Sequence, residues 1–325
     1  MNDVNRLFIG DCKSILPTLE AQSVQTVVTS PPYFGLRDYG VAGQFGQEKS
    51  VEEYVENIVS VFRAIRRVLK DDGTVWLNLG DSYAGSGKNR NADGESCGFQ
   101  SACKQSTVKG RLQGNLKKTP LSGSLKHKDL IGAPWRVAFA LQADGWYLRQ
   151  DIIWHKPNVM PEPVKDRCTK SHEYIFLLSK NRRYYFDYKA IQEDAVTCEK
   201  RLPAIVRNRK YGYNSKLNAM LTQFGKKHAP CRAADAKSES AKRNKRDVWT
   251  INTEAYKGAH FAAFPLRLVM PCILAGSRAG DTVLDPFFGS GTVAEAAALL
   301  GRSWLGIELN PAYEPLYKER LALFA

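Results

Sequence analysis

The sequence lacks long apolar runs, paired cysteines and metal-ligand spacings. No stretch contains the ~20 consecutive apolar residues that span a membrane, and Met1-Asn2-Asp3-Val4 does not begin a signal peptide. Seven cysteines occur without regular spacing, which indicates a reduced, cytoplasmic protein rather than a disulfide framework. Cys97 with Cys103, and Cys168 with His172, have no second pair of ligands, so we expect no metal site.

Acidic residues are also scarce, at 33 against 47 Lys and Arg, and the net charge of +14 is concentrated in two stretches. Residues 200–246 contain fourteen basic and two acidic side chains, and residues 85–128 contain nine basic and two acidic ones. A single basic run is often a solvated tail. Two runs that interrupt an α/β pattern, one with Tyr211, Tyr213 and Phe224 interleaved, favour a surface for a polyanion such as DNA. The side chains expected to bind it are Lys88, Arg90, Lys117, Lys118, Arg207, Arg209, Lys210, Lys226, Lys227, Arg243, Lys245 and Arg246.

A strand, a glycine-rich turn and a helix follow one another near the C-terminus. Thr282–Asp285 is an apolar, β-branched run, and Phe287-Phe288-Gly289-Ser290-Gly291 precedes an alanine-rich helix, Val293–Leu300. The next strand, Ser303–Ile307, ends at Glu308, whose carboxylate can accept hydrogen bonds from ribose hydroxyls. No Lys-Ser/Thr follows the glycines, which argues against a phosphate-binding loop. The pattern indicates a nucleoside cofactor but does not by itself separate S-adenosylmethionine from NAD.

A second motif, Ser30-Pro31-Pro32-Tyr33, follows the apolar strand Val24–Thr29. Two prolines stop a strand and leave carbonyls without ladder partners, because proline lacks an N–H. Those carbonyls and the Ser30 hydroxyl can accept hydrogen bonds from an NH2 group, which makes its nitrogen a better nucleophile. Tyr33 offers a ring on which a base can stack. The motif therefore indicates chemistry at an amino group beside a flat aromatic ring.

In this order the motifs resemble those of DNA amino-methyltransferases of the β order, in which the catalytic half of the chain precedes the cofactor half. The resemblance covers nearly the whole length. The matching segments are Gly10-Asp11-Cys12, Ser30-Pro31-Pro32-Tyr33, Trp154-His155-Lys156-Pro157, His260-Phe261-Ala262-Ala263-Phe264-Pro265, Asp285–Thr292 and Gly306-Ile307-Glu308-Leu309. One short motif is weak support, whereas this ordered set is strong.

The resemblance implies S-adenosyl-L-methionine as cofactor and double-stranded DNA as partner. It assigns catalysis to Ser30, Pro31, Pro32 and Tyr33, and it assigns the binding of a flipped base to Tyr33 and Trp154. It also allows a homodimer and implies a bacterial or phage-encoded cytoplasmic enzyme. The residues expected to bind the cofactor are Asp11, Phe264, Pro265, Asp285, Phe287, Gly289, Ser290, Gly291, Thr292 and Glu308.

Two features of the sequence indicate different bases as the acceptor of the methyl group. In this family, Ser before Pro-Pro-Tyr is commoner in cytosine-N4 enzymes, and Asp or Asn is commoner in adenine-N6 enzymes. The segment Gly35-Leu36-Arg37-Asp38-Tyr39 and the chain as a whole resemble solitary β-order enzymes, some of which act on adenine despite the Ser. The whole-chain resemblance places adenine N6 marginally ahead, and cytosine N4 is the alternative.

The predicted fold is α/β: a doubly wound, mainly parallel, seven-stranded methyltransferase sheet, circularly permuted, with one antiparallel edge hairpin. Residues 1–188 would form the catalytic half, with a mobile basic loop at residues 85–128. Residues 189–250 have no clean periodicity and would form an inserted target-recognition region. Residues 251–325 would form the cofactor-binding half. An amphipathic helix is expected at Glu52–Leu69.

Other classes explain less of the sequence. An NAD-dependent oxidoreductase leaves the Ser30–Tyr33 motif and both basic stretches unexplained, and an inactive DNA-binding protein would be expected to have lost motif residues that are present here. An RNA methyltransferase is a third alternative, because base stacking and basic loops serve either polymer. Cys272 follows Pro271, as in cytosine-C5 enzymes, but it lies in an apolar helical stretch and is expected to be a buried small side chain.

Overall fold

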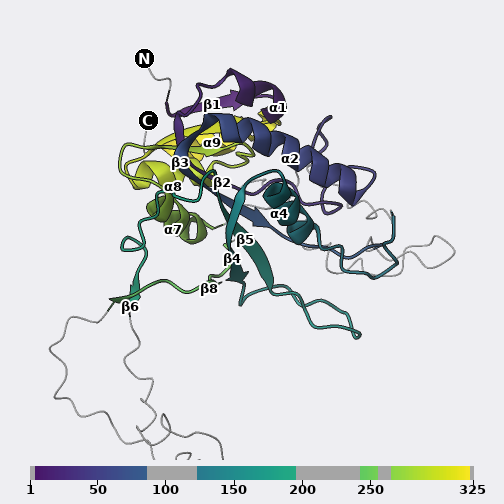
Figure 1. Cartoon of the computed structure of the whole chain (residues 1–325). Helices are drawn as coiled ribbons and strands as arrows, with labels where there is room; N and C mark the ends of the chain where they lie inside the picture. Colours follow the sequence, from purple (N-terminus) through teal and green to yellow (C-terminus); the bar gives the residue numbers. More distant parts are fainter. Residues whose placement is uncertain (1–3, 86–122, 195–241, 255–264, 323–325) are drawn as a thin grey trace, which may run out of the picture. The chain divides into compact units, whose positions relative to one another are not determined.

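The computed structural model describes residues 4–85, 123–194, 242–254 and 265–322 (Figure 1). The chain divides into a main unit, Met1–Ile191 with Arg246–Ala325, and an intervening unit, Gln192–Lys245. In the intervening unit the described residues form β6 (Glu193–Asp194) and β7 (Lys242–Arg243), which pair antiparallel. The predicted basic loop lies outside the described residues except at its two ends.

The described residues of the main unit form an eight-stranded sheet. Several of its strands are labelled in Figure 1. From one edge to the other its strands are β1 (Arg6–Ile9), β10 (Ser303–Glu308), β9 (Thr282–Asp285), β2 (Val24–Thr29), β3 (Leu69–Leu79), β5 (His172–Ser179), β4 (Tyr147–His155) and β8 (Val248–Thr250). Neighbouring strands run parallel except at β5, which is antiparallel to both β3 and β4. The C-terminal strands β9 and β10 therefore lie between β1 and β2, which confirms the permuted order.

The α/β class and the mainly parallel sheet are also confirmed, but the described sheet has one strand more than predicted. The additional strand is β8, which pairs with β4 and places Trp249 opposite Trp154. Three residues are too few to show an alternating pattern, so β8 was included in the irregular region predicted at residues 189–250. Because β8 covers β4, the antiparallel hairpin of β4 and β5 is not the edge of the sheet.

Helices cover both faces of this sheet and make a three-layered unit (Figure 1). On one face, α1 (Cys12–Ile15), α2 (Val51–Val68) and α4 (Ala133–Ala143) contribute to one apolar core cluster. On the other face, α7 (Leu266–Gly276), α8 (Thr292–Leu299) and α9 (Glu314–Leu321) contribute to a second cluster. Short 3-10 turns, η1 (Leu16–Thr18) and η4 (Pro311–Tyr313), follow α1 and precede α9.

Helix α2 shows how the local sequence sets these elements. The Ser50 hydroxyl caps its first turn by accepting a hydrogen bond from the Glu53 backbone N–H (3.1 Å). Acidic residues in the first turn and Arg66 and Arg67 in the last turn complement the helix dipole. Its apolar residues form a buried stripe against the sheet, so the predicted helix is confirmed within one residue at each end.

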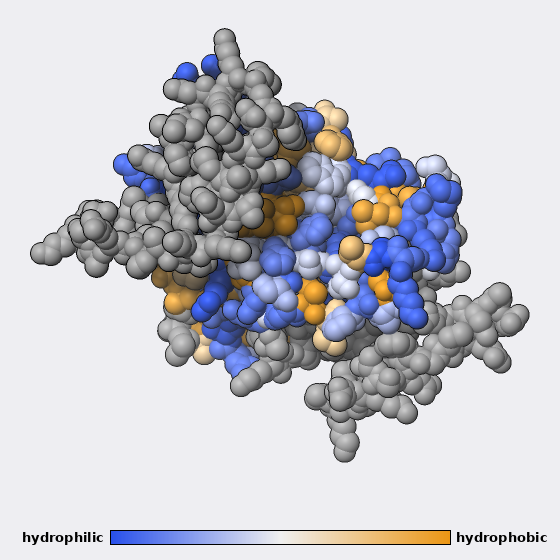
Figure 2. Space-filling model, turned by 90° about the horizontal axis from the view of Figure 1, so that it is seen from below, coloured by the Kyte–Doolittle hydropathy of each residue, from blue (hydrophilic) through white to orange (hydrophobic). Residues whose placement is uncertain are grey.

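The surface drawn in Figure 2 is mostly polar, and its apolar residues form small, separate areas between hydrophilic ones. Scattered apolar side chains of this kind are normal on protein surfaces. Among the residues that the structure describes, no helix combines the length and the apolar character that crossing a membrane requires.

Candidate active site

The carboxyl ends of the parallel strands meet at one edge of the sheet, where the chain forms a cavity of about 520 Å³. Its lining includes Asp11 after β1, the Ser30–Tyr33 segment after β2, Lys156 after β4 and Glu308 at the end of β10. Ligands of open α/β sheets bind at this edge, where the strand order reverses. This volume lies within the range of pockets that bind small organic molecules.

Glu308 connects two segments of the cofactor half. Its Oε2 accepts a hydrogen bond from the Gly289 backbone N–H (2.7 Å), and its Oε1 accepts one from the Asn310 backbone N–H (2.8 Å). Burial raises the pKa of Glu308 above its ordinary value, although these hydrogen bonds act in the opposite direction. Each carboxylate oxygen can accept a further hydrogen bond, so Glu308 can also bind ribose hydroxyls.

The glycine-rich turn has the backbone and the polar groups that a nucleoside cofactor needs. Gly289 and Gly291 have φ angles of 54° and 82°, in the left-handed region that favours glycine. The Ser290 hydroxyl lines the cavity, is buried, and has no hydrogen-bond partner among the described residues. A buried hydroxyl beside a cavity is a natural contact for a polar ligand group. These residues, with Glu308, therefore fit the cofactor that the sequence predicts.

Asp285 joins the cofactor half to the catalytic half instead of facing the cavity. Its Oδ1 accepts hydrogen bonds from the Thr29 hydroxyl (2.7 Å) and from the Phe287 backbone N–H (3.0 Å). The residue is 1% exposed and is not part of the cavity lining. Burial raises the pKa of Asp285 to about 7, against the opposite effect of the two hydrogen bonds. Its observed contacts hold the two turns that form the site.

Only some of the residues predicted to bind the cofactor line the cavity. Those that line the cavity are Asp11, Phe287, Gly289, Ser290, Thr292 and Glu308. Gly291 and Pro265 do not line it: Gly291 caps α8, and Pro265 caps α7. Phe264 lies outside the described residues. The contacts of all these residues with a cofactor stay predictions.

The Ser30-Pro31-Pro32-Tyr33 segment lines the cavity directly after β2. The Tyr54 hydroxyl donates a hydrogen bond to the Pro32 carbonyl (3.0 Å), so that carbonyl already has a partner. The Tyr33 ring packs on the backbone of Gly80, where a Cβ atom would lie 2.5 Å from Tyr33 Cε2. One lone pair of the Pro32 carbonyl is thus occupied, and the Ser30 hydroxyl and the Pro31 carbonyl stay the first candidates to accept from an amino group.

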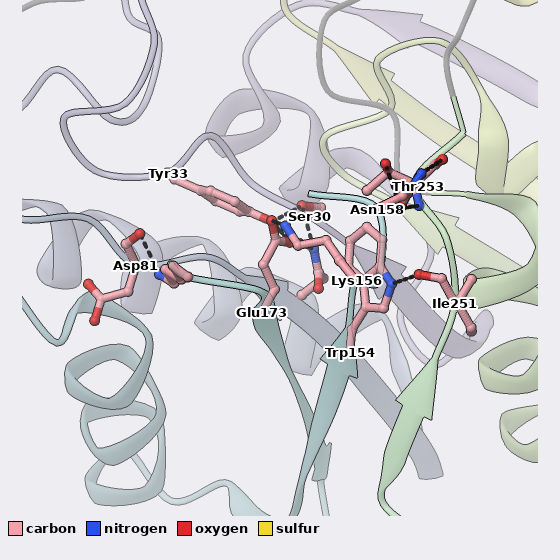
Figure 3. A network of polar contacts seen from close by, with 11 residues as sticks. Ser30, Tyr33, Asp81, Trp154, Lys156, Asn158, Glu173, Ile251 and Thr253 are labelled. Atoms are coloured by element: carbon pink, nitrogen blue, oxygen red, sulfur yellow. Dashed lines mark hydrogen bonds and ion pairs between the residues drawn. The ribbon is translucent and has the colours of Figure 1, made fainter. Parts of the chain in front are cut away.

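A polar network surrounds the Tyr33 hydroxyl (Figure 3). That hydroxyl donates to Glu173 Oε2 (2.7 Å) and lies 3.2 Å from Ser30 Oγ. Asn78 Nδ2 lies 2.6 Å from the Tyr33 oxygen, 3.0 Å from Glu173 Oε2 and 3.3 Å from Ser30 Oγ. Lys156 Nζ donates to Glu173 Oε1 (2.5 Å). Glu173 reaches this edge of the sheet because β5 runs antiparallel and begins where its neighbours end.

Opposing effects set the charge of this network. Burial alone would raise the pKa of Glu173, but the Lys156 charge and the hydrogen bonds from Lys156, Tyr33 and Asn78 outweigh it and lower that pKa. Burial and the Glu173 charge raise the pKa of Tyr33 well above its ordinary value. At neutral pH the network therefore contains an ionised Glu173 and a protonated Tyr33.

Trp154 lies in β4 and is 4% exposed. Its indole N–H donates to the Ile251 carbonyl (2.9 Å), and Lys156 Nζ lies 4.9 Å from the ring centroid (Figure 3). The ring also lines the cavity, so its position is compatible with a contact to a base. That contact stays a prediction.

Most of the residues predicted to bind DNA lie outside the described residues: Lys88, Arg90, Lys117, Lys118, Arg207, Arg209, Lys210, Lys226 and Lys227. Of the other three, Arg243 pairs with Glu193 across β6 and β7, with Nε 3.0 Å from Glu193 Oε1. Lys245 is the last residue of the intervening unit and Arg246 returns the chain to the main unit. Their contacts with DNA stay predictions.

Four residues of the site were not identified from the sequence. Arg37 lines the cavity, and its buried Nη1 has no partner among the described residues. Asn78 was recognisable as a polar residue within the apolar strand Thr74–Leu79, and Glu173 as a charge at the start of another. Lys156 lies in a segment that the family resemblance included, but it had no assigned role.

The sequence model of the DNA methylase family matches residues 24–319, almost the whole chain. The chain belongs to this family. It is an S-adenosylmethionine-dependent DNA amino-methyltransferase, as predicted, and the NAD-dependent alternative is set aside. The Pro271-Cys272 pair has no part in the site, because Cys272 is buried within α7 and its Sγ lies 3.4 Å from the Leu268 carbonyl oxygen.

Relatives of the methylase match over nearly its full length. The type II methyltransferase M.SmaI of Serratia marcescens is 45% identical over 97% of this chain and 90% of its own. M.Cfr9I of Citrobacter freundii is 42% identical over 97% of this chain and 87% of its own. The fold is shared with the cytosine-N4-specific PvuII DNA methyltransferase (TM-score 0.60, 18% identity, 98% and 87% covered). It is also shared with a putative DNA modification methylase of Thermus thermophilus complexed with S-adenosyl-L-methionine (TM-score 0.57, 24% identity, 98% and 94% covered).

Replacing Glu308 is expected to weaken cofactor binding. Glu308→Ala removes charge-assisted hydrogen bonds to the ribose and to the glycine-rich turn, so the Kd for S-adenosylmethionine should rise roughly 10- to 100-fold. Titration calorimetry measures this directly. Glu56→Ala, an exposed glutamate on α2, is the matched control and should bind normally. A folded Glu308→Ala variant with unchanged affinity would contradict the assignment.

Replacing Asp285 is expected to change how stability depends on pH. The folded pKa of about 7 exceeds the ordinary 3.8, so the folded chain keeps a proton that the unfolded chain loses in this range. The free energy of unfolding should therefore fall as pH rises from about 4 to 7, by up to roughly 4 kcal/mol from this group. Asp285→Asn lacks this contribution. Urea unfolding of both proteins without cofactor gives the free energy of unfolding at pH 5 and at pH 8. From pH 5 to pH 8 the variant should become more stable relative to the wild type, and an equal change in both proteins would refute the prediction.

Proposed function

We propose that this methylase transfers the methyl group to N4 of cytosine in duplex DNA, with the target base flipped out of the helix. The observation that carries this choice is Ser30, a neutral hydroxyl in the motif that accepts hydrogen bonds from the amino group. The slight preference for adenine depended on resemblance to solitary enzymes. The relatives that match over the full length are type II methyltransferases, and they lend that preference no support.

The position of Lys156 supports cytosine independently. Its ammonium group carries three N–H donors, one of which is directed at Glu173 Oε1 (2.5 Å), and the residue lines the cavity. Cytosine has a carbonyl, O2, on the same ring as its amino group, and a cation beside the cavity can donate to it. Adenine has a C–H instead of a carbonyl between N1 and N3, so the same donor would have to reach a ring nitrogen instead.

The roles of the catalytic residues follow from this arrangement. When bound, S-adenosylmethionine would supply the methyl group: its C–S bond would break as the bond to the base nitrogen formed, leaving a neutral thioether, and the methylated nitrogen would release one proton. The Ser30 hydroxyl and the Pro31 carbonyl accept the amino hydrogens of the base and direct the nitrogen lone pair. The Tyr33 ring, fixed against Gly80, provides a face for stacking. Positioning supplies most of the acceleration, and no covalent intermediate with the enzyme is needed.

We assign recognition of the DNA sequence to residues 189–250. The intervening unit lies within this range, and residues 200–246 carry fourteen basic side chains against two acidic ones. The catalytic half would then comprise residues 1–188, and the cofactor half residues 251–325, with the basic stretch at 85–128 as a second DNA contact.

The choice of base is tested by mass spectrometry of nucleosides from duplex DNA incubated with the enzyme and S-adenosylmethionine. We expect N4-methylcytosine. N6-methyladenine instead would show that Ser30 serves an adenine enzyme and would refute the assignment to cytosine. A matched reaction with structured RNA should yield no methylated nucleoside.

The stacking role of Tyr33 is tested by Tyr33→Ala. Loss of the ring should lower kcat roughly 10- to 100-fold, because stacking of one base on an aromatic ring contributes about 1–3 kcal/mol. The Kd for S-adenosylmethionine should stay within about twofold of the wild type if stability is retained. Full turnover by this variant would exclude a stacking role.

A further inference from the structure

The carboxylate of Glu173 lies beside the catalytic motif, and the roles assigned above do not use it. The side chains of Glu173 and Lys156 are 14% and 16% exposed and form an ion pair of 2.5 Å. Glu173 Oε2 faces the Tyr33 hydroxyl (Figure 3). The Asn78 amide also lies within hydrogen-bond distance of that oxygen. Partly burying a carboxylate costs free energy unless partners compensate, and here donors from Lys156, Tyr33 and Asn78 all meet this one carboxylate.

The contacts of Glu173 determine which group donates in each hydrogen bond. An ionised carboxylate only accepts, so the single Tyr33 hydroxyl hydrogen is used toward Glu173 Oε2 (2.7 Å). In the contact of 3.2 Å between Ser30 and Tyr33, Ser30 must then be the donor. The Asn78 Nδ2 group also only donates, and it lies within reach of both hydroxyl oxygens. Ser30 thus gives its hydrogen to Tyr33 and keeps a lone pair of Oγ for another donor.

We infer that Glu173 is a positioning residue that orders the hydrogen bonds through the Tyr33 hydroxyl, so that Ser30 presents an acceptor to the amino group of the base. The chain runs from the base N–H to Ser30 Oγ, then to the Tyr33 oxygen and then to Glu173 Oε2. Each hydroxyl donates toward the negative charge and is polarised by it. Tyr33 then serves through its oxygen as well as through its ring. The inference rests on the proposed role of Ser30 and applies to a cytosine or an adenine amino group alike.

Lys156 makes the substitution Glu173→Gln a sharp test. Its ammonium group can only donate, so it would hold the new amide oxygen and turn the amide NH2 toward Tyr33. The Tyr33 oxygen would then accept from that amide, and its own hydrogen would turn to Ser30. Ser30 would present its hydrogen, instead of a lone pair, to the amino group. The change keeps the shape of the side chain and reverses the order of the hydrogen bonds.

The experiment compares Glu173→Gln, Tyr33→Phe and the double variant in steady-state methylation of duplex DNA. Each single variant should lower kcat roughly 10- to 100-fold, as expected for a lost hydrogen bond to a charged group. The KM for S-adenosylmethionine and its Kd should stay within about twofold. The double variant should lose no more than either single variant, because both changes break the same chain. Tyr33→Phe keeps the ring and removes only the hydroxyl. A lower kcat of this variant is therefore due to the hydroxyl and not to stacking.

The control is Glu162→Gln, which removes a carboxylate that pairs with Arg167 on the segment between β4 and β5 and should leave kcat unchanged. Normal turnover by Tyr33→Phe, or losses that multiply in the double variant, would overturn the inference. If Glu173→Gln does not fold, Tyr33→Phe still decides between the two roles of Tyr33. The product base is measured with the wild type, so failure of this inference is distinct from failure of the assignment to cytosine.

Discussion

The parallel pairing of β9 with β2 is the constraint on which the site depends. It brings together two segments that lie far apart in the sequence, and the hydrogen bond from Thr29 to Asp285 joins the ends of the two strands. Only with these strands adjacent do the Pro-Pro turn and the glycine-rich turn open into the same cavity. Asp285 is buried at this junction, so its observed contacts fix the relative position of the two turns.

The parts of the structure that could be predicted from sequence were those with local signals. The helix at Val51–Val68 has a capping residue, a buried stripe and suitable charges, and it was predicted within one residue at each end. The strands before Ser30 and before the glycine-rich turn are buried apolar runs with clear ends. The motifs at those ends identified the family, because their order along the chain is distinctive.

The remaining features depend on contacts between distant segments, which leave little trace in a single sequence. Glu173 belongs to the site only because β5 is antiparallel and begins at the edge where β3 ends. The Pro32 carbonyl appeared available until the fold placed the Tyr54 hydroxyl beside it. Asp285 matched a cofactor motif, yet its carboxylate is directed at Thr29 and Phe287. β8 has three residues, and only its pairing with β4 shows that it is a strand.

The two residues that flank the intervening unit, Ile191 before it and Trp249 after it, belong to the main unit, where both pack in the cluster that contains α7 and α8. Between these residues the chain can change in length and composition at a modest entropic cost, because closing a longer loop costs little more than closing a shorter one. A segment of another length or composition could therefore replace the intervening unit while the pairing of the strands of the main sheet stays the same.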